Sequence, residues 1–209
     1  MTKQFTRSDI DALAQRYRAN LINSLSGFKS ATVVGTTDGK TNNLAIVSSV
    51  VHIGANPPLI GMIMRPHTVT RDTLSNIKQQ GCYTLNHVST EWVDKAHQTS
   101  ARYAPDESEF DAVGLTPQFS ESFPAPFVKE SQIKLGLHVA QHFTLLNETE
   151  MVIGEVHELY LPENIIDEDG YADIEQAKTA CISGLDSYHS TTRIAQFSYA
   201  KPDVKLTKK

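Results

Sequence analysis

Short apolar segments of strand length, separated by turn residues, dominate this sequence and set the main limit on its fold. Residues 31–37 and 44–53 are rich in Val, Ile, Thr and Ser, and Asp38-Gly39 between them is typical of a hairpin turn. Because strands and helices do not alternate regularly, the pattern favours a mainly β antiparallel barrel over a doubly wound parallel sheet. Further strands are predicted over residues 59–65, 82–88, 133–145 and 150–161.

Helical periodicity is confined to a few short stretches. A first helix is predicted over residues 10–25, with Ser8 as N-cap, Asp11 three residues later and Gly27 at its end. Its inward face is expected to carry apolar residues at spacings of three and four, namely Ile10, Leu13, Ala14, Tyr17, Leu21 and Leu25.

Three more helices and one long loop complete the expected elements. Residues 70–81 form a helix that turns Leu74 and Ile77 inward and stops at Gly81. Short helices are predicted over 91–102 and 173–181, and the proline-rich stretch 103–128 is predicted to be a loop with a functional or partner-binding role.

Length and composition bound the class of protein. A chain of 209 residues corresponds to one domain, here 1–209, with a net charge of −5 that disfavours nucleic-acid partners. No apolar run approaches the roughly 20 residues that span a bilayer, and no signal peptide is visible, which predicts a cytoplasmic protein without membrane contact. Cys82 and Cys181 are far apart, so neither a disulfide framework nor a zinc site is indicated.

Two motif-like patterns do not fit the elements around them. Gly35 to Thr41 resembles a nucleotide-binding loop, but it has three residues between its glycines where that motif needs four, and it lies in a hairpin. His138 and His142 have the spacing of a helical metal-binding pair. Because they lie in a predicted strand, where residues four apart are separated by about 13 Å, they are interpreted as ordinary strand histidines.

Hydroxyl and basic residues gather in the middle third of the chain. Ser48 and Ser49 lie on one predicted strand, Arg65 ends the next, and Arg71 and Thr73 stand at the start of the following helix. A helix N-terminus offers unpaired N–H groups and a positive dipole, and arginine adds strong donors to phosphate oxygens. The segment therefore suits one phosphate group.

The same segment resembles the flavin reductase-like family of FMN-binding split-barrel proteins, which includes flavoredoxin and the reductase components of two-component monooxygenases. Looser similarity extends to residues 154–156 and 184–188, so that the resemblance spans about 26–202. Asn56 stands where the family commonly has Asp. The residues that carry the resemblance are Asn43, Ser48-Ser49, Asn56-Pro57-Pro58-Leu59, Arg71-Asp72-Thr73, Asn76-Ile77 and Leu85-Asn86.

The resemblance implies a Greek-key split barrel with short flanking helices, an N-terminal helix and a C-terminal arm. It implies a homodimer that binds FMN near the subunit interface. Ser48 or Ser49, but by strand alternation only one of them, matches the hydroxyl that meets the flavin or its phosphate chain. Arg65, Arg71 and Thr73 match the phosphate end, while the acidic Asp72 is assigned to capping the helix.

Three further positions carry weaker expectations. Asn86 either binds the ribityl chain or closes a turn, and Tyr188 with His189 covers the cofactor from the C-terminal arm. Taken singly, each of these positions also has an ordinary structural interpretation, as a barrel residue, a surface charge or a core aromatic. Their order and spacing together favour flavin binding.

The implied activity is transfer of hydride from NADH or NADPH to flavin, with no catalytic side chain required. The alternatives are an FMN-binding electron carrier that receives electrons from a protein partner, and a structural barrel without cofactor. The choice between NADH and NADPH, and between flavin as cofactor and as substrate, stays open.

Overall fold

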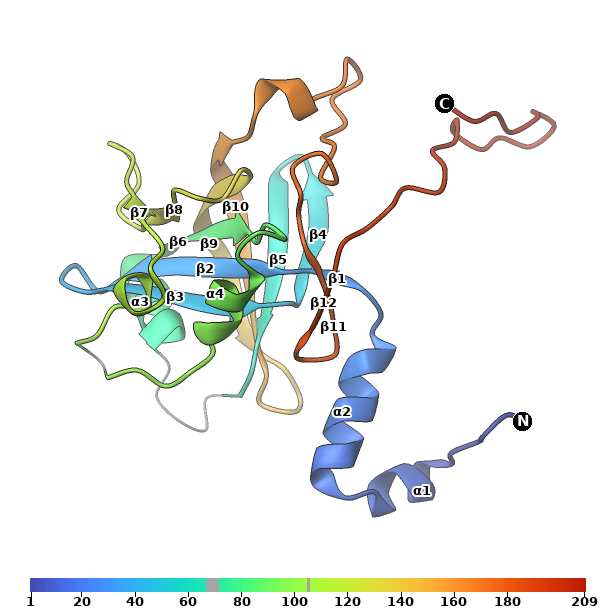
Figure 1. The fold of residues 1–209 in the computed structure, drawn as a ribbon, viewed down its shortest axis with the longest axis horizontal. Coiled ribbons are helices and arrows are strands. Elements are labelled where there is room, and N and C mark those ends of the chain that lie inside the picture. Colours follow the sequence, from blue (N-terminus) through green and yellow to red (C-terminus); the bar gives the residue numbers. More distant parts are fainter. Residues whose placement is uncertain (67–71, 105) are drawn as a thin grey trace.

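A computed structural model describes residues 1–66, 72–104 and 106–209 of the chain (Figure 1). Its centre is a seven-stranded antiparallel sheet in the order β3-β2-β6-β9-β10-β5-β4. The strands of this sheet are β2 (Thr32–Thr37), β3 (Asn42–Val47), β4 (Val50–Ala55), β5 (Pro58–Met64), β6 (Cys82–His87), β9 (Lys134–Thr144) and β10 (Glu150–Tyr160).

Smaller elements surround this sheet. A three-stranded sheet has the order β1-β11-β12, and β7 pairs with β8. The short strands are β1 (Lys29–Ser30), β7 (Pro117–Gln118), β8 (Phe127–Val128), β11 (Cys181–Ser183) and β12 (Ser187–His189). The helices are α1 (Arg7–Ala12), α2 (Gln15–Leu25), α3 (Asp72–Gln80), α4 (Val93–Gln98), α5 (Glu109–Val113) and the 3-10 helix η1 (Glu163–Ile165).

Strand β2 shows why the sheet is buried on both faces. Its six residues are all buried, because alternate side chains enter two different cores. Val34 joins the barrel interior with Leu85 on β6, whereas Val33 joins an outer cluster with Trp92 beside α4 and Phe110 on α5. The predicted mainly β antiparallel barrel with short flanking helices is therefore confirmed.

Helix α3 packs into the barrel core through its apolar face. Leu74 and Ile77 are almost fully buried and belong to the interior cluster, as predicted. Gly81 ends the helix with a φ of 69°, and its N–H donates to the carbonyl of Ile77 over 2.9 Å. The hairpin at Asp38-Gly39 is also confirmed, since Asp38 accepts backbone N–H groups of the turn and β2 pairs with β3.

The N-terminal helix differs from the prediction in its start, continuity and packing. Thr6 and Asp9 form the capping box, in place of Ser8 and Asp11, and the helix is interrupted between α1 and α2. No residue of α2 is buried, and Tyr17 and Leu25 are 54% and 71% exposed. The prediction of an inward apolar face is therefore wrong, since α2 extends away from the barrel (Figure 1).

The predicted helix over 173–181 does not form. The carboxylate of Asp173 accepts the N–H groups of Glu175 and Gln176, Lys178 has a φ of 54°, and the chain then enters β11. A local side-chain cap and a left-handed residue thus favour a turn over a helix. The stretch predicted as a loop, 103–128, contains α5 and the short strands β7 and β8.

Candidate functional site

The two serines lie at the junction between the edge strands β3 and β4. The prediction of one continuous strand over 44–53 is wrong, because Ser48 and Ser49 belong to neither strand. Strand alternation therefore does not decide between them, and both are half-buried. The N–H of Ile63 donates to the carbonyl of Ser49 over 2.9 Å, which seats the junction beside the end of β5.

Arg65 follows directly after β5 at this same place. The ladder pairs Val50 with Met62, so the serine junction continues alongside the last residues of β5. Arg65 itself is exposed. We call the group Ser48, Ser49 and Arg65 the serine–arginine corner; it offers two hydroxyls and one cation. Arg71, the second predicted arginine, lies outside the described residues.

The side chain of Thr73 is buried and hydrogen-bonded inside the protein. It is 5% exposed, and its hydroxyl donates to Oδ1 of Asn43 on β3 over 2.6 Å. A hydroxyl has one hydrogen to donate, and phosphate oxygens accept hydrogen bonds. In this structure the predicted side-chain bond from Thr73 to a phosphate is therefore not available, and Thr73 contributes to the start of α3 from within.

Asn86 neither closes a turn nor faces a ligand. Its side chain is fully buried, donates to the carbonyl of Val33 and the hydroxyl of Thr84, and accepts the N–H of Val128. These bonds tie β6 to β2 and β8. The predicted contact with a ribityl chain has no exposed atom to make it.

Tyr188 and His189 lie on β12, at the end of β2 nearest the serines. The hydroxyl of Tyr188 hydrogen-bonds to Nδ1 of His97 on α4 over 3.0 Å, and burial raises the pKa of this hydroxyl to about 12. His189 bonds to Ser183 and packs edge-on against Phe28. Strand β12 pairs with β11, which pairs with β1 just ahead of β2, and Thr32 of β2 pairs with Val47 just before the serines.

An acidic cavity lies beside the start of α3 and the turn between β2 and β3. It encloses about 100 Å³. It would repel a phosphate, whereas the serine–arginine corner, beyond the other end of β3, carries a cation and suits an anion. Its lining carries three carboxylates among six residues, namely Asp38, Thr41, Asn43, Asp72, Asn76 and Glu107.

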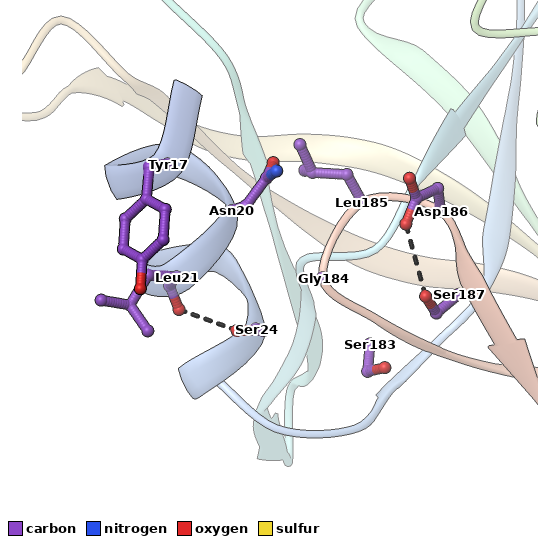
Figure 2. A pocket seen from close by; sticks show the side chains of 9 residues that line it. All are labelled: Tyr17, Asn20, Leu21, Ser24, Ser183, Gly184, Leu185, Asp186 and Ser187. Carbon is purple, nitrogen blue, oxygen red and sulfur yellow. Dashed lines mark hydrogen bonds between the residues drawn. The ribbon is translucent and has the colours of Figure 1, made fainter. Parts of the chain in front are cut away.

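A larger cavity of about 430 Å³ separates α2 from the loop between β11 and β12 (Figure 2). Tyr17 and Asn20 face it from α2, and Leu185 and Asp186 face it from the loop (Figure 2). No cation belongs to its lining among the described residues, so it does not suit a phosphate.

The two histidines with metal-pair spacing both lie on β9, as predicted. His142 pairs with Glu150 on β10 over 2.8 Å, whereas His138 packs against the ring of His157 at 4.5 Å between centroids. Within 1–66, 72–104 and 106–209, no three His, Cys, Asp or Glu side chains gather as a metal site would require. No helix of this part of the chain has the length and apolar character to span a bilayer.

Comparison with known proteins identifies the family. The sequence profile described as flavin reductase like domain matches residues 25–181, which is most of the chain. A crystal structure of a candidate flavin reductase with a split barrel domain from Shewanella frigidimarina is 50% identical, with a TM-score of 0.91 over 95% of this chain and 100% of that chain. This chain belongs to the flavin reductase-like family.

Two more distant structures share the fold. Nitrilotriacetate monooxygenase component B from Bacillus cereus is 21% identical, with a TM-score of 0.83 over 95% of this chain and 99% of that one. Flavoredoxin of Desulfovibrio vulgaris is 22% identical, with a TM-score of 0.69 over 84% of this chain and 91% of that one.

Proposed function

We propose that this protein binds FMN and reduces it with NADH or NADPH. The observation that carries the proposal is the serine–arginine corner, which offers two hydroxyls and a cation where β3, β4 and β5 meet. Membership of the flavin reductase-like family supports the cofactor class.

The donors at this corner match the phosphate end of FMN. Charge-assisted bonds from a guanidinium and hydroxyl bonds are the usual contacts of a single phosphate. Neither serine hydroxyl is hydrogen-bonded to another residue of the part that the structure describes, which leaves both for a ligand.

The role of the protein is to bind and orient the flavin, and the flavin supplies the redox chemistry. The chemistry that FMN would supply when bound is acceptance of a hydride from NADH or NADPH. Ser48, Ser49 and Arg65 would hold the phosphate and so orient the flavin for an incoming nicotinamide. Tyr188 and His189 are proposed to cover this region from β12.

A homodimer is part of the proposal. Two terminal segments, α2 with the residues after it and the C-terminal arm 190–209, extend from the barrel and expose large apolar side chains (Figure 1). Such exposure on projecting segments is typical of an interface. The most exposed of these side chains are Leu25 at 71%, Phe28 at 70%, Ile194 at 96% and Tyr199 at 86%. We propose the cytoplasm as the location, since the free Cys82 and Cys181 fit a reducing compartment.

The test combines binding and reduction. Protein loaded with FMN, desalted and kept free of oxygen is mixed with NADH or with NADPH while the visible absorbance of flavin is recorded. Bleaching by at least one nucleotide is expected. Flavin that stays bound and oxidised with both overturns the reductase and favours the electron carrier, whereas protein that leaves the column colourless overturns FMN binding.

A further inference from the structure

The C-terminal arm 190–209 ends in a small hairpin that has no core of its own. The N–H of Ser198 donates to the carbonyl of Thr207 over 2.9 Å, and the N–H of Lys209 donates to the carbonyl of Gln196 over 2.9 Å. None of the residues 190–209, all of which the structure describes, is buried. Because a lone two-stranded hairpin is only marginally stable in water, the arm needs a surface to pack against. Its large apolar side chains are all exposed, namely Ile194, Phe197, Tyr199, Val204 and Leu206.

Both ends of the arm are held by an acidic turn of the same chain. Arg193 pairs with Asp173 over 2.9 Å, and its guanidinium lies 5.0 Å from the centre of the Tyr171 ring. At the other end Lys209 pairs with Asp169 over 2.8 Å. The hairpin between these contacts projects away from the barrel (Figure 1). In this position it is presented to another molecule.

The charge of the arm favours the body of a second copy as that molecule. Residues 190–209 contain five basic side chains and one acidic side chain, which gives a net charge of +4. Since the whole chain has a net charge of −5, residues 1–189 have −9. Two arms would repel each other, whereas an arm and the body of another copy attract.

A sheet surface of matching character lies on the outside of β4, β5, β10 and β9. The ladders place Ile63 opposite Met151 and Met151 opposite Phe143, and they place Val51 opposite Gly61. These positions alternate with the residues that face the barrel interior. Val51 and Phe143 are exposed large apolar side chains. We call this surface, which also includes Ile53, the outer apolar face.

The outer apolar face is continuous in its middle and acidic at its ends. A Cβ at Gly61 would lie 2.9 Å from the side chain of Met151 and 3.1 Å from that of Ile53, so these two side chains close the gap over the glycine. Strands β4 and β5 contain no charged residue. Glu155 stands on the face opposite Leu59, and the turn between β9 and β10 carries the exposed Glu148. Such a surface suits a segment with apolar and basic side chains.

We propose that the C-terminal arm of each copy packs on the outer apolar face of a second copy. Two-fold symmetry forms this contact twice, so the assembly closes as a dimer. The inference rests on the homodimer of the proposed function and names the two surfaces that meet. The contact adjoins the flavin site, because Ile63 on the outer apolar face donates its N–H to the carbonyl of Ser49.

The first test joins the two surfaces covalently. Full-length protein that carries both Tyr199→Cys and Ile53→Cys is treated with a short bis-maleimide and separated on a denaturing gel. We expect a covalent dimer, because the arm and the face that touch belong to different copies. The controls are the two single variants and the wild type, which retains Cys82 and Cys181; they should yield much less covalent dimer.

The second test measures the strength of the dimer by light scattering over a dilution series. Ile194→Ser with Tyr199→Ser should raise the dissociation constant of the dimer at least about 10-fold, and so should Val51→Ser with Ile53→Ser. Combining the two pairs should add little to either pair alone, since both remove the same contact. Phe119→Ser is the matched control, because Phe119 is an exposed apolar residue in the loop between β7 and β8.

The outcomes separate the inference from the proposed function. Cross-linking within one chain, or a dimer that neither pair of substitutions weakens, overturns the arm contact and leaves the homodimer and FMN binding intact. A monomeric wild type overturns the homodimer and the inference together. Covalent dimer in the double cysteine variant, with non-additive weakening by the two serine pairs, supports the inference. Circular dichroism establishes that each variant is folded, and a dimer of this kind that binds no FMN would overturn the proposed cofactor alone.

Discussion

The backbone N–H of Ile63 donates to the carbonyl of Ser49 over 2.9 Å, and this bond fixes where the two edge strands of the barrel meet. Without it, residues 48 and 49 would be an unsupported connection between β3 and β4. With it, two hydroxyls stand beside Arg65 at the end of β5. The candidate phosphate site is therefore built by barrel closure itself.

Replacing the cation of this corner should affect FMN and not riboflavin. We expect Arg65→Ala to weaken FMN binding by about 1 kcal/mol, which is less than the roughly 1.5–3 kcal/mol of a bond to a charged group because Arg65 is exposed. Arg65→Lys keeps the charge and serves as the control. Titration of flavin fluorescence with both ligands measures the difference. Equal FMN affinity for Arg65→Ala and wild type would place the phosphate elsewhere.

The barrel interior contains a hydroxyl that contributes no visible bond. Tyr83 is fully buried, and among the described residues its hydroxyl has no hydrogen-bond partner. A Cβ at Gly154 would lie 2.4 Å from that oxygen. We expect Tyr83→Phe to raise the free energy of unfolding by about 1 kcal/mol, since an unpaired buried hydroxyl is costly.

Gly154→Ala provides the partner experiment. It should lower the free energy of unfolding by about 2 kcal/mol through overpacking, and Tyr83→Phe in the same chain should recover part of that loss. Urea unfolding measures all three variants. A Tyr83→Phe protein that is less stable than wild type would show that the hydroxyl is bonded after all.

The sequence predicted best what local patterns decide. The β-branched residues of 31–37 and the Asp38-Gly39 turn were sufficient for the β2–β3 hairpin, though not for the end of β3, and Gly81 marked the end of α3. The missed features depend on packing. Glu109 stands in a stretch with no strand or helix signal, and a carboxylate gives no hint that a neighbouring strand will bury it. Asn43 did stand in the recognised segment, but its partners came from three elements.

Two further features, the turn at Asp173 and the strand break at Ser48 and Ser49, were not predicted from the sequence. At Asp173 the side chain caps a turn and ends the helical pattern, and periodicity does not register such a cap. Ser48 and Ser49 break a stretch of strand-forming residues, because the ladder has to pass from β2 on one side to β5 on the other.

Acidification should destabilise the protein through His87. Burial lowers the pKa of this ring to about 4. In the unfolded chain the pKa of His87 is about 6.5. Between the two pKa values the unfolded state therefore binds a proton at His87 and the folded state does not. The contribution of neutral His87 to the free energy of unfolding is complete above about pH 6.5. It is lost at about 1.4 kcal/mol per pH unit as the pH falls toward the pKa of the folded state.

Urea unfolding between these pH values, with wild type and His87→Gln, measures this contribution. The variant should show a flatter dependence on pH than the wild type. Identical slopes for the two proteins would mean that His87 titrates alike in the folded and unfolded states.

The proposed dimer should depend on the apolar residues that follow α2. Leu25→Ser combined with Phe28→Ser removes two side chains that are 71% and 70% exposed. We expect wild type at twice the mass of the chain and a shift toward monomer in the variant, measured by light scattering after size exclusion. Leu146→Ser is the matched control, because Leu146 is fully exposed in the turn between β9 and β10. A monomeric wild type would refute the dimer.

The most direct test of the whole account is a crystal structure of the protein with FMN. We predict the phosphate within hydrogen-bonding distance of Arg65 and of at least one of Ser48 and Ser49. A phosphate bound in the cavity between α2 and the β11–β12 loop, or on any other surface, would contradict it.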